Sequence, residues 1–185
     1  NIAVIYCMEE DFEKGREYYL KAYELAKKTN NKGKMVRYAM NLVKVAHLFN
    51  ELDTARKLLV EANAFSKNDE ALRFEVQAMT ADNYMLRGDL KTAKKILLEL
   101  EAQTNSKDFK NKYNTATVLN LLAKIHFLEK DYDTNIFYLN KYIKVSEDFE
   151  SKANIYSSLT EAYTIKKEYS KALDAMKMMV AAKDS

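Results

Sequence analysis

Residues Leu122–Tyr132, LAKIHFLEKDY, show most clearly the pattern that repeats along this chain. It begins with apolar residues at helical spacing and ends with an acidic residue followed by a bulky apolar one, Asp131-Tyr132. The same pair occurs at four other places: Asp11-Phe12, Glu51-Leu52, Asp89-Leu90 and Glu168-Tyr169. Successive acids are 37 to 42 residues apart. Internal repeats of this length indicate stacked units that bury a core only against their neighbours. We number the repeats 1 to 5 by these acids.

Three rows of residues keep a fixed distance from the acids. Small residues, with one exception, stand four positions after each acid: Gly15, Ala55, Ala93, Asn135 and Ala172. Large residues stand four positions further on: Tyr19, Leu59, Leu97, Leu139 and Met176. Five positions before the acids stand Tyr6, Ala46, Tyr84, His126 and Tyr163. Spacings of three and four keep residues on one face of a helix. An acid also suits the N-cap of a helix. Each repeat is therefore predicted to be a first helix, a tight turn, and a second helix that starts at the acid.

The composition favours helix and bounds the possible functions. The chain of 185 residues has no proline and three glycines, and both residue types break helices. Hydrophobic residues make up 48% and charged residues 31%, which is typical of a globular chain. The net charge of +3 comes from basic and acidic residues that alternate along the chain. A nucleic-acid binder would more often gather its basic residues on one face, so we expect no nucleic-acid binding by this segment.

The pattern resembles the tetratricopeptide repeat, a helix–turn–helix unit of about 34 residues. The clearest matches are Leu122-Ala123…His126…Asp131-Tyr132 and Leu159…Tyr163…Glu168-Tyr169…Ala172. Asn135 departs from the family's small residue, and the proline that often ends the second helix is missing. The resemblance implies an all-α, right-handed α-solenoid of about five helix hairpins. We expect repeats at about 1–31, 32–67, 68–107, 108–148 and 149–185, as a single array cut from a longer protein. First helices are predicted at about 1–8, 33–49, 69–87, 109–129 and 150–166, and second helices at about 11–28, 51–66, 89–104, 131–147 and 168–182.

A narrower resemblance lies at the end of the chain. Residues 169–173 and 181–185 (YSKAL and AAKDS) are similar to the last repeat of sensory proteins from Bacteroidetes-type bacteria. In those proteins a membrane span follows, with a histidine kinase or helix-turn-helix output domain. The resemblance implies a signalling or transcriptional regulator, with this segment on the periplasmic side of the membrane; without it, the segment would be cytoplasmic. No apolar run here is long enough to cross a bilayer, so we expect no membrane insertion by this segment.

Motifs for catalysis and for cofactors are missing from the sequence. His47 and His126 are the only histidines and lie two repeats apart, and Cys7 is the only cysteine. HExxH, CxxC, Walker and GxGxxG patterns are absent. We therefore expect no enzyme, no metal site and no cofactor.

The expected binding surface is the face of the first helices, which line the concave side of such solenoids. The residues expected to be exposed there are Arg37, Met40, Lys44, His47, Ala78, Asp82, Met85, Thr117, Asn120, Lys124, Phe127, Asn154, Ser157, Glu161 and Thr164. Their mixture of charge, amide and apolar groups suits a protein or peptide better than a compact metabolite. The alternative is a structural array that dimerises or acts as a scaffold, with no ligand in the groove.

Overall fold

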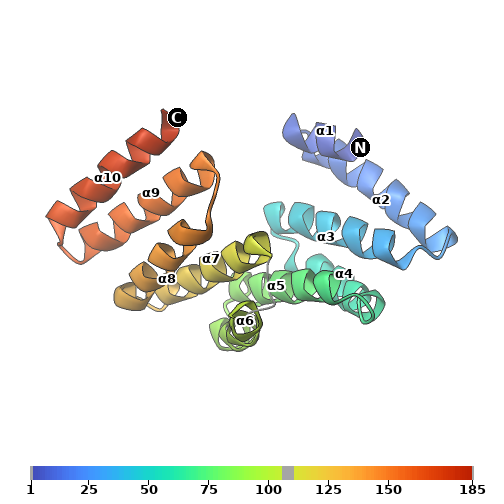
Figure 1. Ribbon diagram of the computed structural model, residues 1–185. Coiled ribbons are helices and arrows are strands. Elements are labelled where there is room, and N and C mark those ends of the chain that lie inside the picture. The colour runs from blue at the N-terminus through green and yellow to red at the C-terminus, as the bar shows by residue number, and fades with distance from the viewer. Residues whose placement is uncertain (1, 106–110, 185) are drawn as a thin grey trace. The chain divides into compact units, whose positions relative to one another are not determined.

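The computed structural model describes residues 2–105 and 111–184, which fold into ten α-helices with no strand among them (Figure 1). The first helices are α1 (Ile2–Met8), α3 (Lys32–Leu48), α5 (Glu70–Leu86), α7 (Lys112–Leu128) and α9 (Phe149–Ile165). The second helices are α2 (Phe12–Lys28), α4 (Leu52–Phe65), α6 (Leu90–Thr104), α8 (Tyr132–Val145) and α10 (Tyr169–Lys183). The predicted helices are thus confirmed to within a few residues. The predicted start of the fourth first helix, at residue 109, lies outside the described residues.

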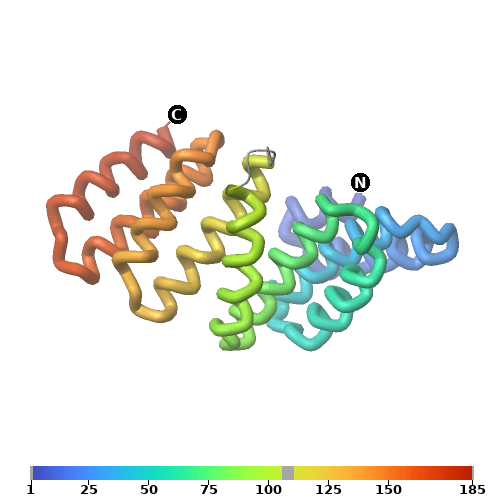
Figure 2. The backbone as a smooth tube through the Cα atoms, turned by 60° about the horizontal axis from the view of Figure 1, so that its bottom comes forward, coloured from blue at the N-terminus to red at the C-terminus, as the bar shows by residue number. Residues whose placement is uncertain are grey.

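The helices pack in two compact units, an N-terminal unit (Asn1–Ala93) and a C-terminal unit (Lys94–Ser185). In the N-terminal unit each helix from α1 to α5 packs on the next, and α3 also contacts α5. In the C-terminal unit α7 packs on α8, α8 on α9, and α9 on α10; the last two run side by side in Figure 2. Each unit is therefore a stack of helix hairpins, the architecture expected of an α-solenoid.

The turn inside every hairpin has the same backbone geometry. The residue before each acid has a positive φ: Glu10 (61°), Asn50 (55°), Gly88 (82°), Lys130 (62°) and Lys167 (60°). In repeat 4 the N–H of Asp131 donates to the carbonyl of His126 at 2.9 Å, and that of Lys130 to Phe127 at 3.0 Å. This pair of bonds closes the end of the first helix as a Schellman motif. The predicted tight turn is confirmed, although only one of the five residues with positive φ is a glycine.

The acids begin the second helices as predicted, but only the aspartates cap them with their side chains. The carboxylates of Asp11, Asp89 and Asp131 accept a backbone N–H three residues on, at 3.2, 3.0 and 3.2 Å. Glu51 and Glu168 make no such bond. The additional methylene of glutamate carries the carboxylate past the helix end, so the prediction of a side-chain cap is wrong at these two sites.

The small and large rows after the acids form the core of each hairpin. All five residues of the small row are buried. Four of the large row are at most 5% exposed: Tyr19, Leu59, Leu97 and Leu139. Met176 is 49% exposed, because no described helix follows α10 to cover it. The large row is therefore buried in repeats 1 to 4 but not at Met176 of repeat 5.

Candidate binding surface

Two predicted site residues of repeat 2 lie on the solvent face of α3. Arg37 and Lys44 are exposed, and their spacing of seven residues places them on the same side of the helix. Neither side chain forms an ion pair with another described residue. Five other cations among the described residues of this unit are paired, for example Arg87 with Asp53 at 2.5 Å, and the rest are not. Arg37 and Lys44 are thus two uncompensated positive charges on one face.

Three residues that were expected on this surface are buried. Met40 and Met85 are 9% and 8% exposed, and Ala78 is 4% exposed. The expectation of exposure is wrong for them, because packing between neighbouring helices covers these side chains. A partner could therefore not contact these side chains without opening the helix packing.

His47 and Asp82, one from α3 and one from α5, are brought together by the fold. His47 Nδ1 lies 3.3 Å from Asp82 Oδ2, and Nε2 lies 3.1 Å from the side-chain nitrogen of Asn83. An amide nitrogen can only donate, so Nε2 accepts and the ring proton is on Nδ1, facing Asp82. Asn83 also donates to the backbone carbonyl of Leu52 at 3.2 Å. This cluster joins α3, the start of α4, and α5, and its bonds are satisfied within the fold.

The predicted residues of the C-terminal unit lie on two helices. Lys124 on α7 is exposed, whereas Asn120 and Phe127 are half-buried. The Phe127 ring packs edge-on against Tyr132, with ring centroids 5.5 Å apart. Asn154 and Glu161 on α9 are exposed and seven residues apart, so they share a face. The other three residues named for the surface, Thr117, Ser157 and Thr164, are half-buried or exposed.

A buried cluster in the C-terminal unit surrounds His126, which is 6% exposed. Its Nδ1 lies 3.1 Å from Asp131 Oδ2, and its ring stacks on Tyr138 at 5.5 Å. The Tyr138 hydroxyl donates to Glu101 at 3.1 Å. Burial, and then the negative charge of Glu101, raise the pKa of Tyr138 to about 12. His126 is therefore a packed core residue with satisfied polar contacts.

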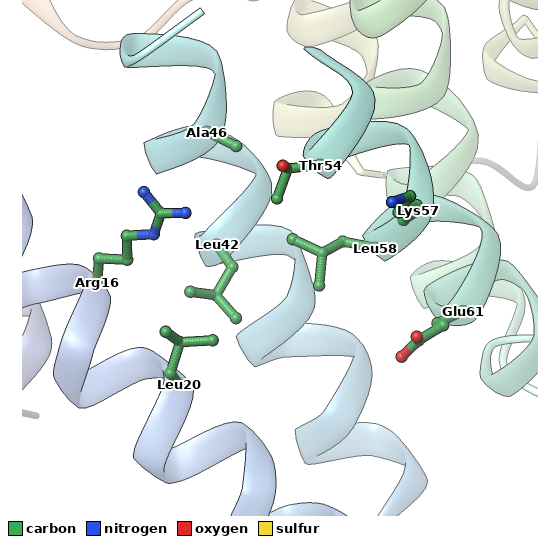
Figure 3. Close-up of a pocket in the computed structure, with 8 residues that line it drawn as sticks. All are labelled: Arg16, Leu20, Leu42, Ala46, Thr54, Lys57, Leu58 and Glu61. Atoms are coloured by element: carbon green, nitrogen blue, oxygen red, sulfur yellow. The ribbon is translucent and has the colours of Figure 1, made fainter. Parts of the chain in front are cut away.

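A surface pocket of about 190 Å³ lies in the N-terminal unit, between α2 and α4 with α3 as its floor (Figure 3). It is lined by Arg16, Leu20, Leu42, Ala46, Thr54, Lys57, Leu58 and Glu61. None of these residues was among the predicted site residues. A signal for it was present in the sequence, because Ala46 is the only residue without a ring in the row five positions before the acids.

Within residues 2–105 and 111–184, no group of three or more His, Cys, Asp or Glu side chains could hold a metal ion. No helix in the described part of the chain is both long enough and apolar enough to cross a bilayer.

Comparison with solved structures gives the class of this fold. No family model and no curated protein matches the chain. Among solved structures, BtubC (BKLC) from P. vanneervenii is similar, with a TM-score of 0.78 and 14% identity over 98% of this chain and 77% of that one. A putative kinesin light chain of Podospora anserina, with nearly identical TPR-like repeats, has a TM-score of 0.69 and 14% identity over 98% of this chain and 92% of that one.

A third similar structure is the APC/C hetero-tetramer Cut9–Hcn1, with a TM-score of 0.76 and 16% identity. This match covers 98% of the present chain but only 32% of the other, so the present chain spans about a third of that protein. The fold is thus an all-helical repeat solenoid. Its helix pairs are those of a tetratricopeptide-like array.

Proposed function

We propose that this chain is a non-enzymatic module that binds a protein or peptide through the exposed face of its first helices. The observation that carries the proposal is the pair Arg37 and Lys44, exposed on one face of α3 and without an ion-pair partner among the described residues. Fixed positive charges on a rigid helix favour an acidic partner by electrostatic complementarity. Lys124 on α7 offers the same chemistry in the C-terminal unit.

The burial of two methionines limits the kind of partner that suits this face. With Met40 and Met85 inside the packing, polar groups make up most of the surface offered by α3 and α5. Apolar anchors are then left to the ends of the first helices, where Leu48 and Leu86 are 64% and 48% exposed. The partner suited to this face is an acidic segment that carries a few apolar side chains.

The test uses fluorescently labelled acidic and basic peptides of equal length, with affinity measured by fluorescence anisotropy. Arg37→Glu with Lys44→Glu should abolish binding of the acidic peptide and leave the melting curve close to that of the wild type, because surface changes cost within about ±0.5 kcal/mol. The matched control is Lys28→Glu with Arg56→Glu, which changes the net charge equally on exposed second-helix positions. Equal loss of affinity in both double variants would refute the first-helix face as the binding surface.

The wider role that we propose is the sensory or interaction region of a bacterial signalling or transcriptional regulator. Its support is the resemblance at residues 169–173 and 181–185. We also propose that the chain is one array with the five repeat boundaries given above, and that this array is part of a longer protein. If the natural chain continues beyond residue 185, a membrane span or DNA-binding domain is expected there, and an unrelated catalytic domain would contradict the proposal.

A second candidate function is a scaffold array that dimerises, and the exposed face of α10 favours it. Leu173, Met176 and Val180 are 53%, 49% and 49% exposed, whereas residues in the row of Met176 are buried in every other repeat. A second copy of the chain could cover this apolar face. Light scattering after gel filtration should then show a dimer for the wild type and a monomer for Met176→Glu. A wild-type monomer at all concentrations would exclude this function.

A further inference from the structure

The pocket in the N-terminal unit has an apolar floor and one open apolar wall. Leu42 and Ala46 of α3 form the floor and are 4% and 3% exposed. Leu20 of α2, which is 44% exposed, and the half-buried Leu58 of α4 form the sides (Figure 3). The pocket therefore offers an apolar surface to a side chain that enters from solvent.

The pocket has a cause in the repeat pattern. At the register of Ala46 every other repeat carries a ring: Tyr6, Tyr84, His126 and Tyr163. In repeats 1 and 4 this ring stacks on a second ring, seven positions after the acid. Tyr6 stacks on Tyr18 at 5.4 Å and His126 on Tyr138 at 5.5 Å between ring centroids.

Repeat 2 lacks both rings of this stack. Ala46 stands where the first ring would be, and Leu58 stands where the second would be. Both residues line the pocket. The hollow is therefore the place that the protein's own aromatic side chains occupy in repeats 1 and 4.

The size of the pocket agrees with one aromatic ring. A cavity of about 150 Å³ lined by apolar side chains takes up benzene. The pocket, at about 190 Å³, has room for one six-membered ring and the methylene that carries it. A ring placed there would gain the area burial and the ring-edge contacts that aromatic side chains make in cores.

The charges at the rim are unevenly compensated. The Arg16 guanidinium is held by both carboxylate oxygens of Glu51, each at 2.8 Å. Glu61 accepts the hydroxyl of Tyr23 and lies 3.7 Å from Lys27 Nζ. Lys57 is exposed and forms no ion pair with any described residue; Asp53, the carboxylate that attracts it from one turn away, is bonded to Arg87. The least compensated charge at the rim is thus positive.

We propose that this pocket binds a phenylalanine or tyrosine side chain from a segment of a partner protein, with an acidic residue of that segment paired with Lys57. The site is separate from the first-helix face, because Ala46 and Lys44 are two residues apart and so lie about 200° apart around α3. It therefore stands or falls independently of the function proposed above.

The probe is the acetylated, amidated tripeptide Glu-Phe-Glu, titrated into the ¹⁵N-labelled full chain and followed by NMR. Chemical shift changes are expected at the backbone amides of Leu42, Ala46 and Leu58. Glu-Ala-Glu, which lacks the ring, and Lys-Phe-Lys, which reverses the charge, should each bind at least about tenfold more weakly. Equal affinities for Glu-Phe-Glu and Glu-Ala-Glu would overturn the proposal.

Variants test the place of binding. Ala46→Tyr restores the ring of the other repeats and should abolish the shifts at Leu42 and Leu58. If Ala46→Tyr does not fold, Leu20→Glu places a charge on the open wall and should have the same effect. Its matched control is Leu98→Glu, at the same register of α6 and also 44% exposed, which should bind like the wild type. Arg37→Glu with Lys44→Glu should also leave the affinity for the tripeptide unchanged. Normal binding by Leu20→Glu, or loss of binding in both Leu20→Glu and Leu98→Glu, would overturn the proposal.

Discussion

The guanidinium of Arg16 on α2 binds the carboxylate of Glu51 through two parallel hydrogen bonds of 2.8 Å. The pair links the second helix of repeat 1 to the start of the second helix of repeat 2. The carboxylate that was expected to cap its own helix is thus used to join two neighbouring hairpins. Both side chains are about one third exposed, so solvent weakens the attraction between them.

A double-mutant cycle with Arg16→Met and Glu51→Gln should give a modest coupling between the two side chains. A paired geometry favours the upper end of the range for exposed ion pairs, about 1 kcal/mol. The free energy of unfolding is measured in urea at 0.1 M and 1 M NaCl. The coupling should shrink at the higher salt concentration. A coupling that is unchanged by salt would contradict an electrostatic origin.

Lys130→Gly should stabilise the chain, by about 0.5–1 kcal/mol. Lys130 has φ 62°, and the left-handed region costs a residue with a side chain roughly 1–2 kcal/mol, which the flexibility of glycine in the unfolded chain partly offsets. Lys95→Gly, inside α6 and also exposed, is the control and should destabilise by about 1 kcal/mol. Urea denaturation gives both values. If Lys130→Gly also lowers the free energy of unfolding, the turn conformation is not strained.

Gly15→Ala should destabilise the first hairpin by about 1–3 kcal/mol, although alanine is the better helix former. A Cβ at this position would lie 2.5 Å from Cys7 Sγ and 3.3 Å from the carbonyl oxygen of Ala3. The neighbouring sulfur is the main obstacle, so Cys7→Ala should relieve most of the loss. Melting temperatures of both single variants and of the double variant test this. A double variant as unstable as the sum of the single changes would rule out the sulfur contact as the cause.

Asp131 should make stability depend on pH at the acid end. Hydrogen bonds from the side chain and the backbone of Thr134, and further contacts to His126, hold the pKa of this carboxyl below its usual value. A folded-state pKa below the unfolded value of about 3.9 contributes stability that is present above that value and is lost as the pH falls through the folded pKa. The advantage of the wild type over Asp131→Asn should therefore shrink below about pH 4.

The control for this measurement is Asp174→Asn, inside α10 and beyond its first turn. Its difference from the wild type should change less than that of Asp131→Asn between pH 6 and pH 2.5. Thermal melts over this range are sufficient. An advantage of Asp131 that grows towards low pH would mean that the cap contact does not form.

The sequence was sufficient to predict the helices, because the acid and the rows around it fix where each second helix starts and which face it buries. It was not sufficient to predict the partners of individual side chains or the burial of every residue. Aspartate and glutamate look equivalent in the repeat pattern, yet their lengths send the carboxylates to different partners. Met40 and Met85 share their helices with exposed residues, and the repeat pattern alone does not show that packing covers these two side chains.

The pocket illustrates the same limit. Alanine at position 46 is visible in the aligned rows, but a missing ring leaves space only if neighbouring side chains do not fill it. In the structure the space is left open, at about 190 Å³, with Leu20 and Leu42 among the residues that line it.

Ala46 also has a consequence for how such arrays diversify. Every copy of the repeat carries the same framework, so the absence of both rings, at Ala46 and Leu58, marks repeat 2 without disturbing the other copies. The residues that distinguish one repeat from the others are then those that depart from the common pattern. Transfer of the Ala46–Leu58 pair to another hairpin would be expected to create the proposed binding pocket in that hairpin instead.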